Sequence, residues 1–179
     1  MKDTAKIRLK KKKLLLVSLI GVLLVLLFLN YTIGLGDYRK TEAPCLFCDI
    51  ANKSLLPKLE YETDEYVIFK DKYPASTHHY LAVPKLHFES IKVLNRSHVG
   101  LVQRMHNGMV EFLIAKGIDT SKAVIGYHIP PFISQKHLHL HGISPPSEMS
   151  FWNRISFMSP SFWFKSSQNT LDSLKRLDL

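Results

Sequence analysis

Cysteine is scarce in this chain: Cys45 and Cys48 are the only two among its 179 residues. One pair three positions apart cannot cross-link distant parts of a fold, so the domain must depend on a buried apolar core, for which the chain is long enough. A lone Cys-x-x-Cys indicates instead half of a metal site or a redox-active pair. The sequence also lacks internal repeats and low-complexity segments, apart from one lysine run.

Excess basic charge is missing from most of the chain, although the formal net charge is +9. Residues 1–13 form a basic N-terminal segment that holds seven of the 24 basic residues and one acid, and so accounts for +6 of that charge. Residues 37–179 carry the remaining +3, an ordinary value that gives no sign of a surface built for a phosphate backbone. We expect no nucleic-acid partner.

Charge is wholly absent from residues 14–36, a leucine-rich stretch. At the rise of an α-helix this stretch is about long enough to cross a hydrocarbon layer of roughly 30 Å, so we predict a single transmembrane helix. A cleaved signal peptide is the alternative, because the basic segment, the apolar run and the small residues Gly34 and Gly36 also fit that pattern. Lys10–Lys13 directly precede the span, and the positive-inside bias then places the N-terminus in the cytosol and the domain in a lumen or outside the cell.

Beyond a linker at 37–43, strand and helix patterns alternate. Runs of β-branched and aromatic residues bounded by turn residues predict strands at 65–70, 79–83, 123–129 and 136–143. Between the second and third strands, apolar residues at helical spacing predict one main helix over 97–116, which ends at Gly117. Strands on both sides of one long helix, joined by short loops, indicate an α+β domain with an antiparallel sheet over residues 44–150.

The C-terminal residues 151–179 are rich in aromatic side chains and end in a predicted helix over 170–177. We expect an extension that packs on the domain, because scattered aromatic side chains usually serve burial. Contact with a partner or a membrane surface is the alternative.

Histidine alternates with leucine at the end of the last predicted strand. Side chains of a strand alternate between its faces, so His137, His139 and His141 should share one face while Leu138 and Leu140 face the core. Three neighbouring imidazoles gain little packing energy, and each is costly if it is buried without a partner. A purely structural role is therefore not expected, and both metal ligation and nucleophilic or acid–base chemistry near neutral pH are open.

The alternating segment His137-Leu-His139-Leu-His141 resembles the His-φ-His-φ-His signature of the histidine triad superfamily. Three further segments resemble that family in the expected order: CLFCDI at 45–50, FKD at 69–71 with THHYLAVPKLH at 77–87, and GYH at 126–128. From about Ala43 to the C-terminus the chain is most similar to the type 3 histidine triad nucleotide-binding proteins of the Hint branch. The resemblance implies a HIT-like antiparallel sheet with one main helix, to which the predicted membrane span is an addition.

The resemblance implies a hydrolase that cleaves the P–N bond of a nucleoside phosphoramidate through a nucleotidyl-histidine intermediate and needs no cofactor for that chemistry. His139 matches the nucleophile of the family. The residues that match its orienting, proton-transferring and phosphate-contacting groups are His137, His141, His79 and Ser134. Asp71 matches the carboxylate that holds the ribose hydroxyls. The residues that match the apolar clamp on a purine base are Leu46, Phe47, Ile50 and Phe69.

In related family members a zinc ion is held by residues that match Cys45, Cys48, His87 and His137. Two thiolates and two imidazoles suit a tetrahedral structural zinc. In an oxidising compartment the two cysteines would form a disulfide instead, and His137 would only orient the nucleophile. Homodimerisation is also implied, because many relatives pair through the main helix and a sheet edge.

Two other classes of function are open on the sequence. The same scaffold could serve a dinucleoside polyphosphate hydrolase, a DNA deadenylase or a nucleotidyl transferase. The chain could also be a non-catalytic nucleotide- or zinc-binding membrane protein.

Overall fold

The computed structural model describes residues 20–22, 24–25, 45–53 and 57–177. The chain divides after Ala43, and the second unit is described here by itself. The predicted transmembrane helix over 14–36 lies almost entirely outside the described residues, as do the basic segment at 1–13 and the linker at 37–43. Among the residues that are described, no helix is long and apolar enough to cross a membrane.

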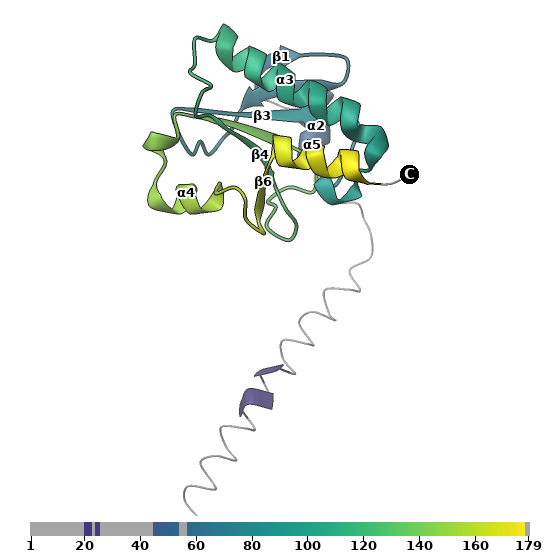
Figure 1. Ribbon diagram of the computed structural model, residues 1–179, viewed down its shortest axis with the longest axis vertical. Helices are drawn as coiled ribbons and strands as arrows, with labels where there is room; N and C mark the ends of the chain where they lie inside the picture. The colour runs from purple at the N-terminus through teal and green to yellow at the C-terminus, as the bar shows by residue number, and fades with distance from the viewer. Residues whose placement is uncertain (1–19, 23, 26–44, 54–56, 178–179) are drawn as a thin grey trace, which may run out of the picture. The chain divides into compact units, whose positions relative to one another are not determined.

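An antiparallel sheet forms the centre of the second unit (Figure 1). Its strands in chain order are β1 (Leu59–Glu62), β2 (Tyr66–Lys70), β3 (His78–Pro84), β4 (Val124–His128), β5 (Leu140–Ser144) and β6 (Phe164–Ser166). In space the order is β1-β2-β3-β5-β4-β6, and each neighbouring pair is antiparallel. Because β5 lies between β3 and β4, the end of the histidine segment sits at the middle of the sheet.

Helices cover both faces of this sheet. The helices of this unit are α2 (Leu46–Ala51), α3 (Val99–Ala115), α4 (Phe151–Ser156) and α5 (Ser167–Arg176), with short 3-10 turns at Ile91–Val93, Arg96–His98 and Pro146–Glu148. On one face, α3 and α5 bury a core that includes Tyr66, Ile68, Tyr80, Ala82, Met105, Met109, Leu140 and Leu171 (Figure 1). On the other face, α2 packs through Phe47 and Ile50 on Val67, Phe69, Leu81 and Val83. Alternate residues of β2 and β3 thus enter opposite cores, as the strand repeat requires.

The predicted α+β architecture with one main helix is confirmed, and the four predicted strands and the helix over 97–116 all occur with small shifts of their ends. The largest difference concerns the strand predicted at 136–143, which begins only at Leu140. Just before this strand, Leu138 N–H donates to the carbonyl oxygen of Phe88, in the loop after β3, at 2.6 Å. His137 and His139, on either side of Leu138, therefore lie beside a loop and not beside a strand.

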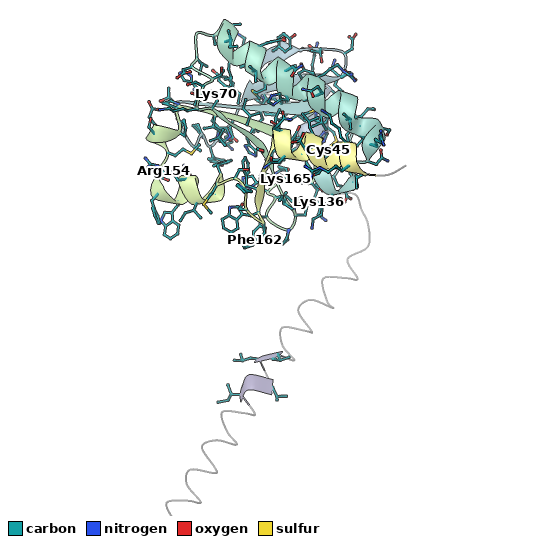
Figure 2. The ribbon with its side chains drawn as sticks, in the orientation of Figure 1. Cys45, Lys70, Lys136, Arg154, Phe162 and Lys165 are labelled. Carbon is teal, nitrogen blue, oxygen red and sulfur yellow. A yellow bond between two sulfur atoms is a disulfide. The ribbon has the colours of Figure 1, made fainter. Side chains whose placement is uncertain are left out.

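The aromatic extension is only partly packed on the domain. It supplies β6 and α5, whose Phe164, Leu171 and Leu174 are buried. By contrast, Phe151, Trp152 and Phe162 are 69%, 73% and 71% exposed, and Phe162 projects from the lower edge of the domain in the view of Figure 2. Burial is thus restricted to the segments that join the sheet or cover it.

The close approach of β4 and β6 gives a test of this arrangement. A Cβ atom at Gly126 would lie 2.5 Å from the backbone oxygen of Lys165 and 2.7 Å from the ring of Phe164. We expect Gly126→Ala to lower the free energy of unfolding by about 1–3 kcal/mol, because β6 would have to move away. The measurement is urea denaturation followed by circular dichroism.

The matched control for this substitution is Gly100→Ala in α3. Its Cβ would meet only the flexible end of Arg104, at 3.0 Å, so stability should be unchanged or raised by up to about 1 kcal/mol through helix propensity. Equal stability of the Gly126→Ala variant and the parent would contradict the close β4–β6 packing.

Candidate active site

The side chains of the three histidines lie on the face of the sheet opposite α3. His137, His139 and His141 are buried, whereas Leu138 and Leu140 belong to the core under α3 and α5. The alternation along this segment therefore agrees with the sequence-based prediction.

His137 has different hydrogen-bond partners from the two histidines that follow it in the triad. Its Nε2 lies 2.9 Å from the carbonyl oxygen of Pro84. A carbonyl oxygen only accepts, so His137 carries its proton on Nε2 and directs the lone pair of Nδ1 at Cys45 Sγ and Cys48 Sγ, 3.2 and 3.3 Å away. His137 therefore directs its ring at the cysteines, from a position that precedes the strand and lies beside the loop after β3.

His139 is arranged as a neutral imidazole with one reactive nitrogen. Its Nδ1–H donates to the carbonyl oxygen of its own neighbour in the triad, His137, at 2.6 Å, which leaves the lone pair on Nε2. Burial lowers the pKa of His139 from 6.5 to about 4, because the charged form would be desolvated. At neutral pH this side chain is therefore uncharged and can act as a nucleophile.

His79 and His141 form a hydrogen-bonded relay beside His139. The backbone N–H of Ala75 donates to His79 Nδ1 at 3.0 Å, so His79 carries its proton on Nε2 and donates it to His141 Nδ1 at 2.9 Å. His141 must then hold its own proton on Nε2, and within the described part of the chain that buried atom has no partner. Burial lowers the pKa of His79 to about 4 and holds that of His141 well below its usual value. The relay thus ends in a neutral N–H donor that lacks an acceptor, which a ligand oxygen would satisfy.

A carboxylate and an aromatic ring lie beside the histidine cluster. Asp71 Oδ2 lies 3.5 Å from His79 Nε2, and Asp71 Oδ1 accepts a hydrogen bond from Tyr73 N–H at 2.8 Å. The ring of Phe47 packs edge-on against those of His139 and His137, at centroid distances of 5.2 and 6.2 Å. The structure therefore brings Asp71 and Phe47 to the triad.

The remaining residues of the predicted clamp lie further from the triad. Ile50 and Phe69 are buried with Phe47 in the core under α2, whereas Leu46 is exposed at the surface of that helix. Ser134 is exposed in the loop between β4 and β5. Of the predicted base-binding residues, Phe47 alone makes a ring contact with the triad histidines in the described part of the chain.

The predicted metal ligands meet at the start of α2, where Cys45 is the N-cap (labelled in Figure 2). Cys45 and Cys48 are joined by a disulfide, and His87 Nδ1 lies 3.4 and 3.2 Å from their two sulfur atoms. The donor atoms of these two cysteines, His87 and His137 all lie within 4.8 Å of one another. They fit a tetrahedral zinc when the cysteines are reduced, and the bond from His137 Nε2 to a backbone carbonyl is the usual support of a ligating imidazole.

Two side chains at the site had no assigned role in the sequence analysis. His128, at the end of β4, has its ring 5.1 Å from that of His141, and its Nδ1–H donates to the carbonyl oxygen of Trp163 at 3.3 Å. Phe157 packs its ring 5.5 Å from His79, 5.0 Å from His128 and 5.1 Å from His141. His128 lies in a segment that carries the family resemblance, which was a usable signal. Phe157 lies in the extension, where no sequence pattern pointed to the site.

Comparison with known proteins agrees with this geometry. The family model described as "Scavenger mRNA decapping enzyme C-term binding" matches residues 44–156. The protein named adenosine 5'-monophosphoramidase HINT3 of Xenopus tropicalis is 39% identical over 133 residues, which cover 73% of this chain and 87% of that protein. Its namesake in Mus musculus is 36% identical over 147 residues, or 80% and 88% of the two chains. This chain belongs to the histidine triad family.

Solved structures of histidine triad proteins share its fold. A histidine triad protein from Clostridium difficile is 29% identical with a TM-score of 0.53, over 55% of this chain and 88% of that one. A HIT family hydrolase from Clostridium thermocellum is 25% identical with a TM-score of 0.54, over 59% and 93%. These two histidine triad proteins share the fold of the triad domain over most of their own length.

Burial of the site histidines makes stability depend on pH. Burial lowers the pKa of both His79 and His139 to about 4, against 6.5 for an unperturbed side chain. Between these values the unfolded chain binds more protons, so the free energy of unfolding should fall as the pH falls, by about 1.4 kcal/mol per pH unit for each histidine. Urea denaturation from about pH 6.5 to 4.5 measures this slope. His139→Asn should reduce the slope by the share of one histidine, and an unchanged slope would contradict the burial of a neutral His139.

Proposed function

We propose that this histidine triad protein hydrolyses nucleoside 5'-phosphoramidates by breaking the bond between the α-phosphorus and an amine nitrogen. The observation that carries the proposal is His139, whose Nδ1–H is bound to a backbone carbonyl and whose Nε2 keeps a lone pair. Further support comes from the relatives named adenosine 5'-monophosphoramidase HINT3 in Xenopus tropicalis, Mus musculus and Danio rerio, which are 39%, 36% and 31% identical.

The first step is the attack of His139 Nε2 on the α-phosphorus. A bond forms between this nitrogen and phosphorus while the bond to the amine breaks, and Nδ1–H stays on the carbonyl of His137. The Nε2–H of His141 donates to a non-bridging phosphoryl oxygen and stabilises the charge that develops there. The departing amine takes a proton from water, and the hydroxyl of that water then adds to phosphorus and releases His139. One water is consumed in total.

The nucleoside half of the substrate is held on the side of Asp71 and Phe47. A carboxylate offers four lone-pair positions, so Asp71 can accept two ribose hydroxyls while it keeps the bond from Tyr73 N–H. Phe47 offers an aromatic wall beside the nucleophile, which suits a purine base.

We also propose that Cys45, Cys48, His87 and His137 hold a structural zinc ion in the reduced protein. A zinc at these residues would tie the start of α2 to the loop after β3 and to the triad segment. The disulfide, by contrast, joins two cysteines of the same segment and links no separate elements. The role of the metal would be to hold Phe47 of α2 beside the nucleophile, so it supplies rigidity and not a reacting group.

Replacement of the nucleophile tests the proposed reaction. His139→Asn should leave a folded protein that binds adenosine monophosphate, while hydrolysis of adenosine 5'-phosphoramidate falls by at least about 10³-fold, because an amide nitrogen has no lone pair to attack phosphorus. Product formation is followed by phosphorus NMR. His106→Asn is the control, because His106 lies on α3 and bonds to Ser167 Oγ. Hydrolysis by His139→Asn at the parent rate would show that the nucleophile is wrong.

Metal analysis tests the zinc proposal. The full chain prepared under reducing conditions should contain about one zinc per chain, and Cys48→Ser should lower zinc affinity at least about tenfold. We expect the zinc-free variant to show a raised KM with kcat nearly unchanged, because Phe47 loses its position but no reacting atom is touched. A reduced parent without zinc would contradict the proposal, and so would a cysteine variant whose zinc affinity equals that of the parent.

A further inference from the structure

The amide that fixes the relay belongs to a short turn between β2 and β3. Its residues Ala75 and Ser76 are buried, whereas Thr77 is exposed. The backbone N–H of Ala75 is the donor that forces His79 to carry its proton on Nε2. The tautomer of His141 follows from that of His79, so this turn determines which nitrogen of His141 bears a proton.

The turn is held from outside by the segment that follows the triad strand. Ser76 Oγ–H donates to the carbonyl oxygen of Pro145 at 2.7 Å, directly after the end of β5. Both the backbone N–H and the hydroxyl of Thr77 donate to the carboxylate of Glu148, the former at 3.2 Å. The side-chain amide of Asn153 in α4 lies 3.4 Å from the carbonyl oxygen of Ala75. The segment after β5 thus holds the turn through Glu148 and Thr77, and the turn holds His79, which bonds to His141 in β5.

We infer that Glu148 is a positioning residue of the histidine relay: by holding Thr77 it keeps the Ala75 amide on His79 and so maintains the tautomer of His141. The inference deepens the proposed function, on which it rests, because it assigns a role to a residue outside the triad. Glu148 touches neither the triad imidazoles nor a reacting atom.

The chemistry at His79 explains why the turn must be held. Without the amide of Ala75, His79 can carry its proton on Nδ1. The lone pair of His79 Nε2 would then face the lone pair of His141 Nδ1 and the carboxylate of Asp71, which is repulsive. Either of two changes relieves this repulsion: His79 binds a second proton, or His141 carries its proton on Nδ1, toward His79. In each case the Nε2–H of His141 that faces the phosphoryl oxygen is lost or misaligned, and the transition state loses a hydrogen bond.

The test compares Glu148→Ala with Glu148→Gln in the full chain. Glu148→Ala removes every acceptor for Thr77, so kcat for adenosine 5'-phosphoramidate should fall about tenfold while KM and zinc content stay close to the parent values. Glu148→Gln keeps one carbonyl acceptor and should restore part of kcat. Glu111→Ala, at an exposed position of α3, is the matched control and should behave as the parent.

A spectroscopic readout separates positioning from a general loss of stability. In protein labelled with ¹⁵N-histidine, the parent should show His79 protonated on Nε2 alone, and Glu148→Ala should show a mixed or charged His79 with His139 unchanged. Thr77→Val, which removes the hydroxyl donor but leaves the backbone donor, should shift kcat and the His79 signals in the same direction by a smaller amount. Combined with Glu148→Ala it should add little, because both act on one contact.

The outcomes distinguish this inference from the proposed function. A parent protein that does not hydrolyse the phosphoramidate would refute the proposed function, while the His79 signals would still report whether Glu148 sets the tautomer. A parent that hydrolyses it, with Glu148→Ala and Thr77→Val both matching the parent in kcat and in the His79 signals, would overturn the inference. Should Glu148→Ala fail to fold by circular dichroism, Glu148→Gln and Thr77→Val decide the matter by the same two measurements.

Discussion

The hydrogen bond from His139 Nδ1 to the carbonyl oxygen of His137 is the interaction on which the chemistry of this site depends. It fixes one tautomer of a buried, uncharged imidazole and leaves a single nitrogen available for bonding. Desolvation supports the same state, because it makes the protonated form costly. The sheet contributes by holding β5 at its middle, and in the segment just before β5 the backbone carbonyl of His137 meets the ring of His139.

The surrounding structure extends that constraint to other elements. On one side, the backbone carbonyl of Pro84 directs His137 to the two cysteines at the start of α2, and Phe47 of that helix packs against His139. On the other side, a backbone amide of the β2–β3 turn orients His79, and His79 orients His141. A backbone carbonyl can only accept and a backbone N–H can only donate. These fixed roles therefore determine the tautomers of His137, His139 and His79, and through His79 that of His141.

The sequence was sufficient for the α+β architecture, the main helix and the alternation of His137, His139 and His141 with leucine, because these follow from regular apolar periods. The family resemblance added the meeting of Cys45, Cys48, His87 and His137, which are distant in sequence. It could not supply what depends on loop geometry: the late start of β5 and the contacts of Phe157 and Glu148. Those residues lie in irregular segments, where no residue period predicts direction. The membrane span over 14–36 stays a prediction.

The central claim is tested most directly by trapping the reaction of the parent protein with a phosphoramidate before water completes it. Rapid quenching under conditions that preserve phosphorus–nitrogen bonds, followed by mass spectrometry of peptides, should find a nucleotidyl group on His139, attached through Nε2. A substrate that turns over with no such adduct under those conditions, or with the nucleotidyl group on another residue, would contradict the account.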